Sequence, residues 1–170
     1  MTPEEITNKL RERFGDAVQE VNLDGFLPFA LVNSSKIAEV CEFLKDDDDL
    51  KFDFLSNLGG RDLGEQFEVF YMLYSYNRRH SFTIKTRTTR DNPHVPTVAG
   101  VWRAAEWHER ETFDMFGIVF DGHPDLRRIL LPSDWEGYPL RKDYVYPESY
   151  GGIKLLRDEE GWPDPSPRIK

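Results

Sequence analysis

The stretch from Glu109 to Pro132 restricts the fold of this chain more than any other part of the sequence. It places acids, arginines, phenylalanines and turn-forming residues close together. At 3.6 residues per turn, one helix face here contains Trp102, Ala105, Glu109, Phe113 and Phe116. Glu109 therefore lies within an apolar stripe, and a buried carboxylate is costly without a cationic or hydrogen-bonding partner. This segment must be paired, buried or docked.

The cations nearest to this helix in sequence suggest its pairing. Arg127 and Arg128 follow the helix and are the candidate partners of Glu109. Glu106, Arg110 and Asp114 recur at four-residue spacing, so Arg110 can bridge an acid on either side. Gly117 supplies the left-handed residue that ends the helix.

A catalytic alternative is that the acids of this helix and His108 ligate a metal or perform acid–base chemistry. No second histidine follows His108 at the spacing of a zinc-protease helix, and no matching carboxylate helix is evident. The four histidines, His80, His94, His108 and His123, are scattered singly and are interpreted as turn or surface residues. Pairing and docking are therefore favoured over catalysis.

Composition limits the partners and the compartment. The 170 residues are 39% hydrophobic, which suits one core, and the net charge of −9 disfavours nucleic acid and anionic membrane surfaces. No apolar run approaches the roughly 20 residues that cross a bilayer, so any membrane association is expected to be indirect. The acidic N-terminus is unlike a secretory signal and predicts a cytosolic location. The single cysteine, Cys41, is interpreted as part of the core.

The periodicity predicts an α+β fold. A helix is expected from the Thr2-Pro3 cap to Gly15, a strand over 27–32, and a second helix carrying Ile37, Val40, Cys41 and Leu44. A period of two then marks strands at 52–54, 67–73 and 82–86, with breaks at 59–60 and 76–79. These strands favour a mainly antiparallel sheet, packed in two layers with both helices. Residues 91–96 are expected to form a linker, with Thr97 capping the charged helix.

The outward positions of the last strand carry Lys85, Arg87 and Arg90, a basic patch interpreted as a solvated strand face. After residue 131 the composition changes to prolines, glycines and aromatic residues. We therefore expect a domain over residues 1–131 and an extended arm over 132–170. Tryptophans and tyrosines are unusual in a disordered tail, so the arm is expected to lie on another protein; the alternative is that it folds back on its own domain.

The order of motifs resembles a known family. The motifs are Glu109-Arg110-Glu111, Asp114-Met115-Phe116-Gly117, Phe120, Gly122-His123-Pro124, Leu126-Arg127-Arg128, Leu130 and Pro139-Leu140-Arg141-Lys142-Asp143-Tyr144. Together they are similar to the signature of the 30 kDa subunit of respiratory NADH:quinone oxidoreductase, complex I. The order of elements from about Phe26 onward agrees with that family.

The resemblance implies a noncatalytic assembly subunit in the peripheral arm of a proton-pumping complex. It implies no catalytic, cofactor or metal residue in this chain, with FMN and iron–sulfur clusters held by partner subunits. The expected partners are the large quinone-site subunit and the iron–sulfur subunits, on the cytoplasmic side of the bacterial inner membrane or the equivalent matrix or stromal side. The motif and docking residues would be Glu109, Arg110, Glu111, Asp114, Phe116, Gly117, His123, Pro124, Arg127 and Arg128, with Arg141, Lys142 and Asp143 in the arm.

Two other functions stay open at this point. The same signature recurs in the corresponding subunit of membrane-bound hydrogenases and ferredoxin-linked complexes. A standalone carboxylate or metal enzyme is the alternative from a different class. On the first two hypotheses, Arg128 pairs with a buried or interfacial acid and supports assembly.

Overall fold

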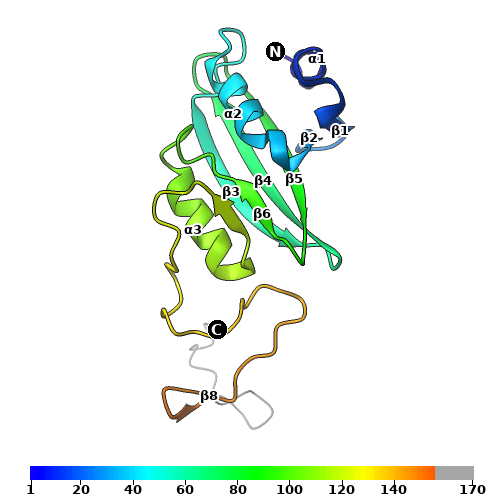
Figure 1. Cartoon of the computed structure of the whole chain (residues 1–170). Helices are drawn as coiled ribbons and strands as arrows, with labels where there is room; N and C mark the ends of the chain where they lie inside the picture. The colour runs from blue at the N-terminus through cyan, green and yellow to red at the C-terminus, as the bar shows by residue number, and fades with distance from the viewer. Residues whose placement is uncertain (156–170) are drawn as a thin grey trace, which may run out of the picture.

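The computed structural model describes residues 1–155, as a two-layer domain with a C-terminal segment below it (Figure 1). The helices are α1 (Pro3–Phe14), α2 (Ile37–Asp46) and α3 (Ala105–Phe116), with short 3-10 turns at Gly15–Ala17 and Ser34–Lys36. The strands are β1 (Val18–Asn22), β2 (Phe29–Val32), β3 (Phe54–Asp62), β4 (Gln66–Ser75), β5 (His80–Thr89), β6 (His94–Pro96), β7 (Val119–Asp121), β8 (Ser149–Tyr150) and β9 (Ile153–Lys154).

Helix α1 begins and ends where the sequence predicts. The Thr2 hydroxyl accepts from the Glu5 amide at 3.3 Å, and the Glu5 carboxylate accepts from the Thr2 amide at 2.8 Å, which completes a capping box. Gly15 ends the helix with a positive φ of 51°. Ile6 and Leu10 are fully buried, so the apolar face of α1 covers part of the core.

The main sheet has five strands in the order β1-β2-β5-β4-β3. Strands β3, β4 and β5 form the expected antiparallel meander, and β2 lies parallel to β5. The predicted α+β class with a mainly antiparallel sheet is confirmed. Strand β1, which pairs antiparallel with β2, was not predicted because its residues Val18–Asn22 alternate weakly.

The break predicted at Gly59 and Gly60 is wrong, because β3 continues through both residues. The glycines instead provide room. A Cβ on Gly60 would lie 2.8 Å from the Phe116 ring and 3.0 Å from the Thr112 methyl carbon, so the missing side chain lets β3 approach α3. The expected linker at 91–96 is also partly wrong, because β6 pairs in parallel with β7 there.

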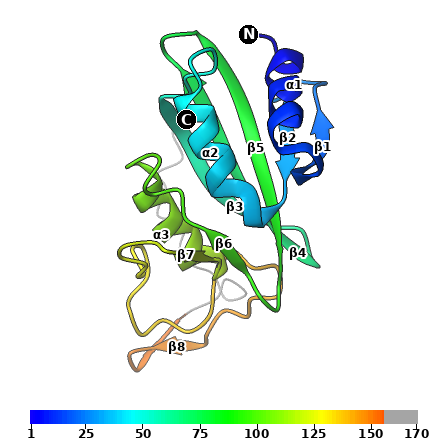
Figure 2. The same ribbon diagram turned by 45° about the horizontal axis from the view of Figure 1, so that its top comes forward.

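Alternation along the strands separates two sheet faces. On one face, β4 contributes the buried residues Phe67, Val69, Tyr71 and Leu73 to a core shared with α1, α2 and α3. Figure 2 shows α2 crossing this face, with Cys41 buried among its core residues as expected. On the other face, the Glu68 carboxylate is almost fully buried by Arg61 at 2.9 Å, Arg87 at 3.2 Å and Lys85 at 3.7 Å. The basic patch is therefore partly neutralised by Glu68.

Candidate functional site: a clasp between α3 and the C-terminal segment

Helix α3 is positioned by its two ends. It begins at Ala105, and no side chain caps it; the predicted cap by Thr97 is wrong. Trp102 lies just before the helix and is fixed by a hydrogen bond of 2.9 Å from its indole N–H to the Phe52 carbonyl. At the other end Gly117 adopts a φ of 72°, and a Cβ there would lie 2.5 Å from both Arg141 and Tyr138. The end of α3 is therefore in direct contact with the C-terminal segment.

Asp114 holds the backbone that follows β7. One carboxylate oxygen accepts hydrogen bonds from the amides of Ile129, Leu130 and Leu131 at 3.0, 2.7 and 2.9 Å. The other accepts from the Arg128 guanidinium at 2.7 Å. Burial raises the pKa of Asp114, but the three amides and Arg128 outweigh burial and hold the pKa below its ordinary value. Asp114 is therefore ionised and fully used by this segment.

Arg110, one turn earlier on α3, contacts the same backbone from its carbonyl side. Its guanidinium donates to the carbonyls of Arg127 at 3.2 Å and Arg128 at 3.4 Å, and it lies 5.1 Å from the Trp107 ring centroid. The predicted bridging of Glu106 and Asp114 by Arg110 is wrong. Backbone carbonyls, which the sequence pattern does not reveal, are the acceptors.

Arg128 connects α3 to residues further along the chain. Besides Asp114, its guanidinium donates to the carbonyls of Trp135 and Gly137, both at 3.0 Å. It also lies 5.1 Å from the centroid of the Tyr138 ring. The expectation that Arg128 pairs with an acid is met by Asp114 rather than by Glu109.

A second set of contacts fixes residues 140–143. Arg141 donates to the Phe116 carbonyl at 2.6 Å and stacks 4.6 Å from the Tyr138 ring, so a cation satisfies the C-terminal end of α3. The Asp62 carboxylate accepts from Arg90 at 2.7 Å and from the Lys142 amide at 2.9 Å. Arg90 also pairs with Asp143 at 2.5 Å. The near part of the predicted arm thus folds back on its own domain.

We call this arrangement the clasp and define it by six side chains. They are Asp62, Arg90, Arg110, Asp114, Arg128 and Arg141. Burial raises the pKa of Asp62, but hydrogen bonds from Arg90 and two backbone amides lower it overall to about 2. Asp62 and Arg90 were missed as site residues, because they reach α3 and the C-terminal segment only through the folded sheet.

The remaining motif residues have different surroundings. Arg127 is 70% exposed and pairs with Asp125 at 2.8 Å, so the predicted pairing of Arg127 with Glu109 is wrong. Glu111 and Pro124 are exposed. The side chain of His123 is fully buried, as is most of His80, which corrects the interpretation of these two histidines as surface residues.

Glu109 is fully buried and is held by uncharged donors. Its carboxylate accepts from the Thr97 hydroxyl and, at 2.7 Å, from the Val98 amide. The His123 Nε2 atom lies 4.0 Å away and donates to the Glu106 carbonyl at 3.0 Å. Burial raises the pKa of Glu109 to about 7, and its two hydrogen bonds only partly oppose this.

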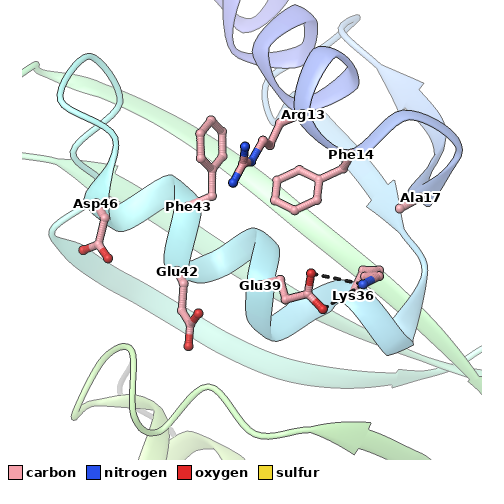
Figure 3. Close-up of a pocket in the computed structure, with 8 residues that line it drawn as sticks. All are labelled: Arg13, Phe14, Ala17, Lys36, Glu39, Glu42, Phe43 and Asp46. Atoms are coloured by element: carbon pink, nitrogen blue, oxygen red, sulfur yellow. Dashed lines mark hydrogen bonds and ion pairs between the residues drawn. The ribbon is translucent and has the colours of Figure 1, made fainter.

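Other parts of the described structure offer less organised sites. A groove of about 550 Å³ lies between α1 and α2, and Figure 3 shows Phe14 and Phe43 facing each other in it beside the Lys36–Glu39 ion pair. Within residues 1–155, no group of three or more His, Cys, Asp or Glu side chains is arranged to hold a metal ion. In the same residues, no helix is long and apolar enough to cross a membrane. The clasp is the most extensive set of buried charges in this part of the chain.

The fold and the clasp define a small α+β domain whose charged side chains fasten its own C-terminal segment. Residues 30–150 match the family described as the respiratory-chain NADH dehydrogenase 30 kDa subunit. The chain belongs to this family and is a subunit of NADH-quinone oxidoreductase.

One relative and two solved structures illustrate the similarity. The family member of NADH-quinone oxidoreductase from Chloroherpeton thalassium is 44% identical over 149 residues, which cover 86% of this chain and 62% of that protein. A trypsin-resistant fragment, residues 1–134, of Nqo5 has a TM-score of 0.64 at 27% identity, covering 74% of this chain and 100% of the fragment. A chain of a membrane-bound sulfane sulfur reductase, an archaeal respiratory membrane complex, has a TM-score of 0.71 at 25% identity, covering 85% and 86% of the two chains.

Proposed function

We propose that this chain is a noncatalytic docking subunit in the peripheral arm of a proton-pumping NADH:quinone oxidoreductase. The observation that carries the proposal is the clasp. It fixes the backbone of residues 127–143 through polar contacts, while Leu130 and Leu140 in that segment remain 62% and 54% exposed. A preorganised backbone that presents apolar side chains loses less conformational entropy when a partner binds.

The partners that fit this role are the large quinone-site subunit and the iron–sulfur subunits of the peripheral arm. FMN and the iron–sulfur clusters would be held by those partners, and no catalytic group is assigned to this chain. The chain would then reach the cytoplasmic face of the membrane only through the complex. Its net charge of −9 suits a protein partner better than nucleic acid.

We also propose a functional division close to residue 131. Residues 1–131 would form the domain, and residues 132–170 would form the arm that meets the partner, its near part held by the clasp. The trypsin-resistant fragment of the relative, which ends at its residue 134, supports such a boundary. Residues 156–170 of the arm lie outside the described residues.

The same docking role in a complex with another electron donor is the second candidate. The similarity to a chain of an archaeal membrane-bound sulfane sulfur reductase favours it, because related domains occur in complexes of different chemistry. The co-purifying subunits distinguish the two candidates. An NADH-oxidising flavin subunit supports the first, and its replacement by a hydrogenase or ferredoxin-linked module supports the second.

The test is purification of the tagged full chain from its native membranes in mild detergent. Leu140→Asp should reduce recovery of the partner subunits at least tenfold, because it introduces a charge into an apolar contact. The control is Tyr76→Asp, which is 63% exposed in the turn after β4, at the opposite end of the β3–β4 hairpin from Asp62. Recovery with Leu140→Asp equal to the control would contradict the docking role of this segment.

A further inference from the structure

Glu109 is the one buried carboxylate of α3 that the clasp does not use. It contacts the segment before α3, where the Thr97 hydroxyl and the Val98 amide are its donors. Thr97 also accepts from the Ala99 amide at 3.1 Å, so its hydroxyl proton is directed to Glu109. The carboxylate is therefore a junction between α3 and residues 97–99.

The groups that face Glu109 supply no positive charge. The Nδ1 atom of His123 accepts from the Asp125 amide at 3.0 Å, so the ring is neutral and carries its proton on Nε2. Cys41 on α2 and Tyr71 on β4 also interact electrostatically with Glu109, and both are neutral in the core. The ammonium of Lys45 on α2 donates to the Val101 carbonyl.

An ionised Glu109 is thus buried with neutral donors only, which favours either a bound proton or exposure to water. We propose that Glu109 is a proton-operated latch, which joins α3 to the Thr97–Val98 segment when protonated and releases that junction when it ionises. In the protonated state the carboxyl can donate to the Thr97 oxygen while still accepting from the Val98 amide. This property is separate from docking and belongs to the free chain.

The direction of the pH dependence follows from linkage. The folded-state pKa of about 7 lies above the ordinary value of 4.5, so the closed junction is most stable below pH 4.5. It loses stability as the pH rises from there toward 7 and changes little above that range. Between pH 5 and pH 8, this shift corresponds to a rise in the opening equilibrium of on the order of 70-fold.

The experiment is amide hydrogen exchange of the full chain, read at Val98 and corrected for the intrinsic pH dependence of exchange. In the wild type, Val98 protection should fall on the order of 70-fold between pH 5 and pH 8. In Glu109→Gln this fall should vanish, because the amide can accept from Val98 and donate to Thr97 without titrating. Glu111→Gln, which alters an exposed acid on the same helix, should retain the wild-type profile.

Two results would overturn the proposal. The first is Val98 protection that stays constant with pH in the wild type, a measurement that needs no variant. The second is a pH profile unchanged in Glu109→Gln, which would assign the titration to His123 or another group.

Discussion

Replacing Arg128 with methionine tests the clasp at its most connected residue. Methionine keeps most of the length of the side chain and removes the guanidinium, which leaves Asp114 buried without a cation. Removing one partner of a buried ion pair typically costs about 3–5 kcal/mol. Asp114 keeps three amide donors, so we expect the lower end, about 3 kcal/mol, in the free energy of unfolding.

The assay is urea unfolding of the full chain, followed by tryptophan fluorescence. The matched control is Arg127→Met at the neighbouring arginine, whose ion pair with Asp125 is solvent-exposed, and the free energy of unfolding should be unchanged within error. A double-mutant cycle with Asp114→Asn should show that the two losses are strongly non-additive. Equal stability of Arg128→Met and the control would refute the assignment of Arg128 as the central residue of the clasp.

Three further predictions concern single positions. Gly117→Ala should destabilise the chain by more than about 1 kcal/mol, because φ is positive and a Cβ would meet Arg141; thermal unfolding measures this. Asp62→Asn should remove the part of acid unfolding between pH 3.8 and about 2, since the lowered pKa of Asp62 adds stability above 3.8 that is lost on descending through its folded value; acid titration by circular dichroism tests this. Cys41 should react with a thiol reagent at pH 8 only after unfolding, because burial raises its pKa; native and urea-treated rates test this.

Local sequence signals identified the elements that depend on neighbouring residues. The Thr2, Pro3 and Glu5 pattern located the start of α1, and the alternation of Phe67, Val69 and the residues that follow located β4. The glycine pair at 59–60 misled, because glycine marks both turns and close backbone approaches. Only the position of Phe116 against β3 distinguishes these cases.

The candidate site shows a similar division. The sequence located Asp114 and Arg128 on neighbouring segments, but it paired Glu109 with arginines because charge was the visible signal. The actual donors to Glu109 are a hydroxyl and a backbone amide, which depend on the path of residues 97–99. Asp62 and Arg90 could not be predicted either, since the β-sheet brings them to the C-terminal segment from 80 and 53 residues away in sequence.

The two buried carboxylates of α3 differ in their partners, and this difference separates two functions along one helix. Asp114 receives a guanidinium and three amides, which lower its pKa and keep the clasp ionised at neutral pH. Glu109 receives two neutral donors, and burial raises its pKa to about 7. A rise in pH from 5 to 8 should therefore loosen the Thr97–Val98 junction while the clasp stays closed. A single helix can thus hold the C-terminal segment constantly at one end and respond to protons near its middle.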